Sequence, residues 1–291
     1  MTQGPFQMTA HLWVAQSDLY LTNSGIFLSE GQAGLIDPGV FPGEIQAIAA
    51  FVAGRSCRPQ WLVLTHSHWD HILGPEHLSG VPVVAQENYL AEVSGPYGDL
   101  TRGVIAEWES RHDIARKDPF LFPQPDVTFG ETITLTVGTL SMRLVHAPGH
   151  AADQLVVYHP ESATLWAADM LSDLEIPFVS HSLSAYQGTL AMLTSWEVRV
   201  LIPGHGHPTS DPEEIRARLT EDSTYLAELR EKVAQCLRQG KTVEETLACC
   251  ETMRYRCPED NTGPHRLNVG SAYSELGGEA DPTKYGWSQI P

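Results

Sequence analysis

The sequence predicts an α/β fold followed by a helical segment, and three observations support this assignment. Short apolar runs alternate with helical patterns between residues 33 and 85, which indicates parallel strands joined by crossover connections. Apolar and polar residues alternate through 127–146, which is typical of antiparallel strands. After Pro208 the apolar residues recur at helical spacing. We therefore expect an α/β domain over residues 1–208 and a helical extension over 209–291 that packs on it.

Turn and capping residues delimit the elements of the first half. Glu30-Gly31-Gln32 is typical of a hairpin turn, and Gly54 marks the end of the first helix. Residues 61–64 are all apolar, as in a buried parallel strand. In order, we expect strands at 12–16, 19–24, 26–30, 33–37, 61–64 and 81–85, helical connections at 43–54 and between 64 and 81, a helix at 98–115 and a loop at 118–126.

Capping signals organise the second half. Ser184 with Gln187 has the pattern of a capping box, and Thr242 with Glu245 repeats it. Asp211 is typical of a helix N-cap. We expect two or three antiparallel strands within 127–146, further strands at 154–159, 163–169 and 198–203, and helices at 185–197, 212–239, 243–252 and 264–277.

Composition narrows the functional class. The chain of 291 residues has 36 acidic and 18 basic residues, and a net charge of −18 argues against a nucleic-acid partner. No apolar run approaches the roughly 18–20 residues that span a bilayer, so no membrane association is expected. The first residues show no signal peptide and the five cysteines are an odd number, so we expect a cytoplasmic protein. The partner expected is a small-molecule substrate, and a homodimer is left open.

The segment Thr65-His66-Ser67-His68-Trp69-Asp70-His71 carries the strongest chemical signal. It follows an apolar strand, and in extended backbone alternate side chains share a face. His66 and His68 can therefore converge on one ion, while Asp70 and His71 reach a second. Imidazole and carboxylate without thiolate suit Zn²⁺, Fe²⁺ or Mn²⁺.

Further donors are expected from three later strand ends. His150 follows the strand that ends near residue 146, Asp169 ends the strand 163–169, and His205 follows the strand 198–203. Ligand sites of α/β sheets lie at the carboxyl ends of strands. These side chains are therefore candidates to complete the metal site.

The motifs THSHWDH, APGH, AAD and PGHG, in this order, resemble those of the metallo-β-lactamase-fold hydrolase superfamily, and LIDPG at 35–39 resembles the motif before its metal loop. The resemblance covers roughly residues 10–210. It implies an αββα sandwich with two divalent metal ions at one edge. By this resemblance His66, His68 and His150 hold the first ion, Asp70, His71 and His205 hold the second, and Asp169 bridges them.

The resemblance also implies roles around the ligands. Asp37 orients the metal loop or is a plain turn former, and Asp70 is the catalytic candidate that steers the nucleophile or passes a proton. The loop after Asp169 lines the pocket mouth, which makes substrate candidates of Phe178, His181 and Tyr186. Ala168 replaces a glycine often found before the bridging aspartate, a departure that we expect not to affect ligation.

The predicted function is hydrolysis of an ester, thioester or lactone by metal-bound hydroxide at a zinc pair, with iron or manganese as alternatives. Glyoxalase II and acyl-homoserine lactonases share this ligand set, whereas true β-lactamases usually lack an acid at the position of Asp169, so β-lactamase activity is a side activity at most. The alternatives are a mononuclear iron persulfide dioxygenase and a non-catalytic metal-binding module. A nuclease is disfavoured by the acidic charge.

Overall fold

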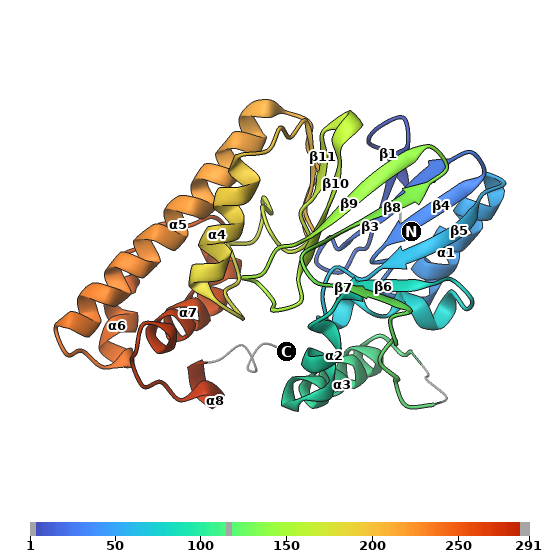
Figure 1. Cartoon of the computed structure of the whole chain (residues 1–291). Helices are drawn as coiled ribbons and strands as arrows, with labels where there is room; N and C mark the ends of the chain where they lie inside the picture. The colour runs from blue at the N-terminus through green and yellow to red at the C-terminus, as the bar shows by residue number, and fades with distance from the viewer. Residues whose placement is uncertain (1–3, 115–117, 286–291) are drawn as a thin grey trace.

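Two β-sheets form the centre of the molecule in the computed structural model, which describes residues 4–114 and 118–285. The sheets stack face to face, with helices on both outer sides (Figure 1). The seven-stranded sheet has the order β1 (Phe6–Gln7), β2 (Leu12–Gln16), β3 (Asn23–Ser29), β4 (Gln32–Ile36), β5 (Arg58–Val63), β6 (Val83–Gln86) and β7 (Val127–Phe129). The five-stranded sheet has the order β12 (Val200–Ile202), β11 (Thr164–Trp166), β10 (Leu155–His159), β9 (Leu140–His146) and β8 (Thr132–Val137).

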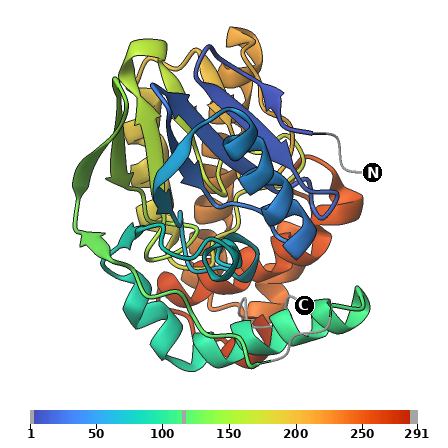
Figure 2. The same ribbon diagram turned by 90° about the vertical axis from the view of Figure 1, so that its right-hand side faces the viewer.

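The helices cover the outer faces of this sandwich. One outer side carries α1, and the other carries α4 and α5, while α2 and α3 lie below the sheets in Figure 1. The helices are α1 (Pro42–Gly54), α2 (Tyr89–Ser94), α3 (Pro96–Arg111), α4 (Leu183–Thr194), α5 (Pro212–Arg238), α6 (Val243–Cys250), α7 (Pro258–Glu275) and α8 (Pro282–Tyr285). The αββα layering expected from the sequence is therefore present, with helices α5 to α8 added at its C-terminal end (Figure 2).

Strand alternation explains why the sandwich has three apolar layers. In β3, Phe27 points between the sheets, whereas Ile26 and Leu28 pack in the cluster that contains the apolar residues of α1. Residues of both sheets, such as Trp61 and Trp166, fill the central layer. The third cluster joins the outer face of the five-stranded sheet to α4, α5, α6 and α7. The C-terminal helices thus share a core with the sheet that they cover.

Several expected elements differ from those observed. Residues 19–24 and 26–30 do not form two strands, because β3 runs through Gly25. Two short 3-10 helices, Trp69–His71 and Gly74–His77, replace a full helix between β5 and β6. The segment 127–146 divides between the sheets, because β7 pairs parallel to β6 while β8 and β9 form an antiparallel hairpin.

Helix boundaries show smaller differences. Helix α4 begins at Leu183 and is capped by Ser182, so the expected capping box at Ser184 is wrong. The Asp211 cap and the Thr242–Glu245 capping box are confirmed. The last long helix begins at 258 rather than 264. The helix expected at 98–115 ends at Arg111, and residue 115 lies outside the described residues.

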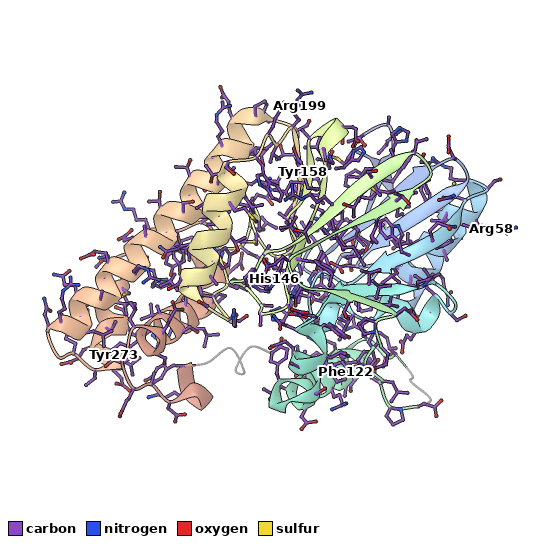
Figure 3. All side chains as sticks on the ribbon, viewed as in Figure 1. Arg58, Phe122, His146, Tyr158, Arg199 and Tyr273 are labelled. Carbon is purple, nitrogen blue, oxygen red and sulfur yellow. The ribbon has the colours of Figure 1, made fainter. Side chains whose placement is uncertain are left out.

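The sheet topology places four loops at one edge. These are the loops that follow β5, β9, β11 and β12. His146, the last residue of β9, marks the start of one of them and lies near the middle of the molecule (Figure 3). Across the described residues, no helix combines the length and hydropathy that a bilayer crossing demands.

Candidate metal centre

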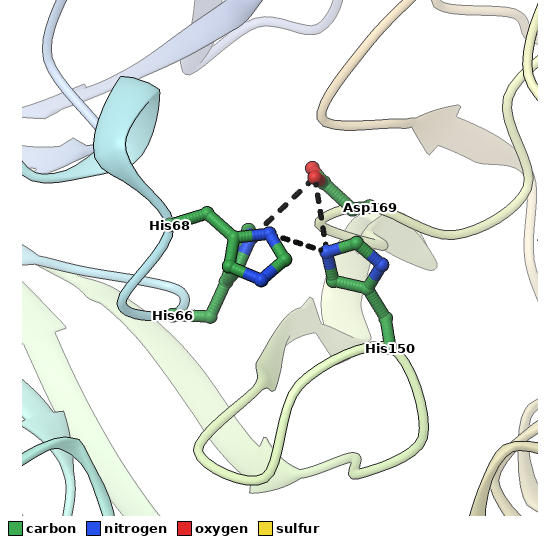
Figure 4. A group of neighbouring side chains, drawn as sticks. All are labelled: His66, His68, His150 and Asp169. Atoms are coloured by element: carbon green, nitrogen blue, oxygen red, sulfur yellow. Dashed lines mark hydrogen bonds and ion pairs between the residues drawn. The ribbon is translucent and has the colours of Figure 1, made fainter. Parts of the chain in front are cut away.

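The first donor group joins three loops. His66 and His68 come from the loop after β5, His150 from the loop after β9 and Asp169 from the loop after β11 (Figure 4). His68 Nδ1 lies 2.8 Å from His150 Nε2. Asp169 Oδ2 lies 3.4 Å from His66 Nε2 and 3.3 Å from His150 Nε2. The four side chains therefore turn their donor atoms toward one point.

The second donor group lies on the other side of Asp169. It consists of Asp70, His71 and His205. His205 Nε2 lies 3.3 Å from His71 Nε2 and 3.3 Å from Asp70 Oδ2. Asp169 Oδ1 lies 3.2 Å from His71 Nε2, and its Oδ2 lies 3.4 Å from His205 Nε2. The Asp169 carboxylate is thus within reach of both groups.

Hydrogen bonds on the outer ring nitrogens orient the imidazoles. His71 Nδ1 faces Asp37 Oδ2 at 3.0 Å. His150 Nδ1 faces the Phe178 carbonyl oxygen at 3.0 Å, and His205 Nδ1 faces the Tyr20 carbonyl oxygen at 3.3 Å. A hydrogen bond at one ring nitrogen fixes the tautomer that presents the other nitrogen as a ligand. His71, His150 and His205 therefore offer Nε2 to the centre.

Asp37 connects the metal loop to the end of β4. Its Oδ1 accepts the Thr65 amide at 2.8 Å, and its Oδ2 accepts the Thr65 hydroxyl at 2.6 Å as well as facing His71. The Thr65 hydroxyl oxygen also lies 3.0 Å from His66 Nδ1. One buried carboxylate therefore orients residues of both donor groups.

Burial and neighbouring charges shift the pKa values of these histidines in opposite directions. Burial lowers the pKa of His66 to about 3 and that of His68 well below its usual range, so both rings are neutral lone-pair donors at pH 7. Burial also opposes the charged form of His205, but Glu175 and Asp169 outweigh it and raise its pKa to about 10. Several carboxylates surround His205, and a divalent cation that binds among them would take the place of the proton on its ring.

The donor atoms fit metal ions better than they fit one another. His66 Nε2 and Asp169 Oδ1 are buried and lack a hydrogen bond of normal geometry among the described residues. Buried polar atoms without partners are rare in folded proteins. Imidazole nitrogens and carboxylate oxygens are ligands for Zn²⁺ and for divalent iron or manganese. The cluster is therefore typical of divalent-metal binding.

Gly204 makes room for the Asp169 carboxylate. A Cβ atom on Gly204 would lie 2.1 Å from Asp169 Oδ1, whereas one on Gly188 in α4 would meet nothing within 4 Å. We expect Gly204→Ala to displace Asp169 and weaken zinc affinity about 10–100-fold in a chelator competition, the usual effect of disturbing groups that orient ligands. Gly188→Ala is the matched control, and equal affinities of the two variants would contradict the assigned role.

The three substrate candidates occupy different environments. Phe178 lines a cavity beside Asp169, and its ring centroid lies 6.4 Å from that of His150. Tyr186 is fully buried in α4, and its hydroxyl donates to the Asp169 carbonyl oxygen at 3.2 Å. His181 is exposed and interacts electrostatically with Glu92. The structure thus places Phe178 beside the centre and Tyr186 behind it.

Three residues near the centre were not found from the sequence. Tyr97 of α3 has its ring centroid 5.7 Å from that of His68, and Tyr20 lies 6.4 Å from His205 by the same measure. Glu175 interacts electrostatically with both donor groups. Tyr97 and Tyr20 lie in no motif, because long-range packing brings them to the site, whereas Glu175 lies in the loop after Asp169 that was expected to line the pocket mouth.

Asp153 is a buried carboxyl group beside the metal loop. Its Oδ1 accepts the Ser67 hydroxyl at 3.2 Å, while Oδ2 has no hydrogen-bond partner among the described residues. Burial, assisted by the charge of Glu92, raises its pKa from 3.8 to about 7. The folded protein therefore holds this proton more tightly than the unfolded chain, and stability falls as the pH rises from about 4 to 7.

We expect Asp153→Asn to remove this part of the pH dependence. Urea unfolding at saturating zinc should show the wild type losing about 2 kcal/mol more than the variant between pH 5 and pH 8. Parallel curves for the two proteins would show that Asp153 does not titrate in this range.

Comparisons with known proteins agree with this geometry. The model of the metallo-beta-lactamase superfamily matches residues 18–216. A linear primary-alkylsulfatase of Pseudomonas sp. is 26% identical over 245 residues, 72% of this chain and 46% of the relative. A hydroxyacylglutathione hydrolase of Brucella anthropi is 24% identical over 232 residues, 78% of this chain and 74% of the relative. An acyl-coenzyme A thioesterase of Gallus gallus is 26% identical over 166 residues, 52% of this chain and 58% of the relative.

Solved structures show the same fold. A stereoselective inverting sec-alkylsulfatase from Pseudomonas sp. matches with a TM-score of 0.72 at 18% identity, over 99% of this chain and 52% of that chain. A metallo-beta-lactamase from Pontibacter korlensis matches with a TM-score of 0.59 at 21% identity, over 78% of this chain and 99% of that chain. The chain spans about half the length of its alkylsulfatase relatives. Its sandwich, its clustered donors and the family match over 18–216 together show that the chain belongs to the metallo-beta-lactamase superfamily.

Proposed function

We propose that the protein is a binuclear metal-dependent hydrolase that cleaves an ester, thioester or lactone bond. The observation that carries the proposal is the position of Asp169, whose two oxygens face both donor groups. In this proposal His66, His68 and His150 bind one ion, and Asp70, His71 and His205 bind the other. Asp169, whose carboxylate reaches residues of both groups, would be shared by the two ions, and zinc suits these nitrogen and oxygen donors.

The ions, when bound, lower the pKa of coordinated water and polarise the carbonyl oxygen of the substrate. Asp70 lies at the edge of the second group, 3.3 Å from His205 and 3.7 Å from His71, so it can orient the attacking water or carry a proton to the leaving group. Asp37 keeps the metal loop in place through Thr65 and His71. The Tyr186 hydroxyl fixes the backbone of Asp169 by donating a hydrogen bond to its carbonyl oxygen.

The class of substrate bond is supported by the relatives. The hydroxyacylglutathione hydrolase and the acyl-coenzyme A thioesterase both carry names of thioester-cleaving enzymes. A linear primary-alkylsulfatase is also a relative, at 26% identity over 72% of this chain, so sulfate esters belong in the test as comparison substrates. A small-molecule substrate and a cytoplasmic location remain predictions, and a homodimer stays an open alternative. The net charge of −18 supports a partner other than nucleic acid.

Elemental analysis combined with a substrate panel tests the proposal. We expect two zinc ions per chain and turnover of an ester, thioester or lactone, with sulfate esters and β-lactams as comparison substrates. His68→Ala should lose metal and turnover, whereas His77→Ala, which removes a histidine outside the donor groups, should keep both. A single iron with oxygen uptake would instead identify a dioxygenase, and two ions without turnover of any substrate would indicate a metal-binding module.

A further inference from the structure

The loop between β11 and α4 is held in place by the C-terminal helix α7. Asn261 accepts the amide of Ile176 at 3.3 Å and donates to the carbonyl oxygen of Leu174 at 2.8 Å, so its side chain brackets Glu175. Asn268, two turns further along α7, makes the same pair of bonds to Val179 and Pro177, each at 2.7 Å. Both asparagines are buried. The backbone around Glu175 is therefore fixed from both sides.

The half-buried side chain of Glu175 lies near the metal centre. Its carboxyl group interacts electrostatically with His205, Asp169 and Asp70, and so with both donor groups. The charge of Glu175 also reaches Tyr20, which lies beside His205. Glu175, Phe178 and Asp169 line the same small pocket. Glu175 thus belongs to the wall of the site although it is in neither donor group.

The Glu175 carboxylate also lacks the partners that neutralise its neighbour. Asp173, on the same loop, receives the His207 amide and faces His207 Nδ1, both at 2.8 Å. Within residues 4–114 and 118–285, by contrast, no hydrogen-bond donor or ion-pair partner reaches the carboxylate oxygens of Glu175. Burial raises the pKa of Glu175, and at pH values above that pKa the rigid, unpaired carboxylate presents its negative charge to a group that approaches the site.

We propose that Glu175 is a specificity-determining residue that excludes anionic substrates and admits neutral or cationic acyl donors. This inference rests on the proposed hydrolase function. In a bound metal pair, Asp70 and Asp169 offset part of the cationic charge, and Glu175 lowers the remaining attraction for an anion further. A negative group on the substrate near this carboxylate is disfavoured about tenfold or more at the effective dielectric constant of a partly buried site.

The test compares Glu175→Gln, which keeps the shape and removes the charge, with the wild type. Glu231→Gln on the exposed face of α5 is the matched control for loss of one negative charge. The substrates are para-nitrophenyl esters of pentanoate, glutarate and γ-trimethylammonio-butyrate, which have similar length and differ in charge. We expect Glu175→Gln to raise kcat/KM for the glutarate ester about tenfold relative to the pentanoate ester. Glu175→Gln should also lower kcat/KM for the cationic ester relative to the pentanoate ester. Glu231→Gln should leave both ratios of kcat/KM unchanged.

Binding without turnover gives a second readout. Calorimetric titration of free glutarate into the zinc-loaded proteins should give a Kd about tenfold lower for Glu175→Gln than for the wild type, at equal zinc content. An unchanged Kd would overturn the inference, and so would loss of zinc from Glu175→Gln, because Glu175 would then be a ligand. If the wild type cleaves no ester, thioester or lactone, the proposed function fails, while the glutarate titration still tests Glu175.

Discussion

Asp169→Ala is expected to remove the metal pair and to lower turnover roughly a thousandfold, the effect of losing several kcal/mol of charge stabilisation in the transition state. The Asp169 carboxylate lies within 3.4 Å of imidazole nitrogens from both groups, so no other described side chain can take its place between them. Zinc content by mass spectrometry and kcat on the best ester of the panel are the measurements.

The controls separate this effect from misfolding. Asp260→Ala removes an exposed carboxylate of α7 and should retain zinc and turnover. Asp169→Asn keeps an oxygen on one side only, so we expect it to retain one ion more tightly than the other. If Asp169→Ala keeps two zinc ions and normal turnover, the bridging assignment is wrong.

Asp37→Asn is expected to have the second-largest effect. Asp37 is 1% exposed, and its carboxylate serves both Thr65 and His71. The amide can replace only part of these interactions, so we expect zinc affinity to fall about 10–100-fold and the free energy of unfolding to fall by about 1–3 kcal/mol. Chelator competition and urea unfolding of the zinc-loaded protein measure the two effects.

Asparagine is the informative substitution at this position. Asp37 has a left-handed backbone with φ of 42°, which asparagine tolerates better than alanine. Asp37→Ala should therefore cost more stability than Asp37→Asn. Asp18→Ala, at an exposed site, is the control for loss of one carboxylate. Normal zinc affinity in Asp37→Asn would leave Asp37 as a turn former only.

The metal loop was predictable because its information is local. His66 and His68 lie two positions apart after an apolar strand, and His150, Asp169 and His205 each follow a strand end. The sheet topology then brings these ends together. The contribution of α7 was not predictable, because Asn261 and Asn268 acquire their role only when the helix packs on the loop that holds Glu175.

The helix cap and strands that were predicted wrongly also depend on contacts between segments far apart in the sequence. Ser184 was expected to cap α4, but its hydroxyl and amide bind Glu275 of α7, which leaves Ser182 as the cap. The expected break between 24 and 26 is wrong, because Gly25 lies inside β3; glycine fits there since a Cβ atom would be 2.8 Å from the Trp166 ring of the facing sheet. Alternation predicted two or three antiparallel strands within 127–146, which is correct for β8 and β9 but wrong for β7, because alternation reports which faces are buried and not which strand is the neighbour.

The most direct test of the account is a crystal structure of the zinc-loaded protein with anomalous diffraction data at the zinc edge. The account predicts two anomalous peaks, one bound by His66, His68 and His150 and one bound by Asp70, His71 and His205. The Asp169 carboxylate should contact both. A single peak, or peaks away from these side chains, would contradict the binuclear centre on which the proposed function depends.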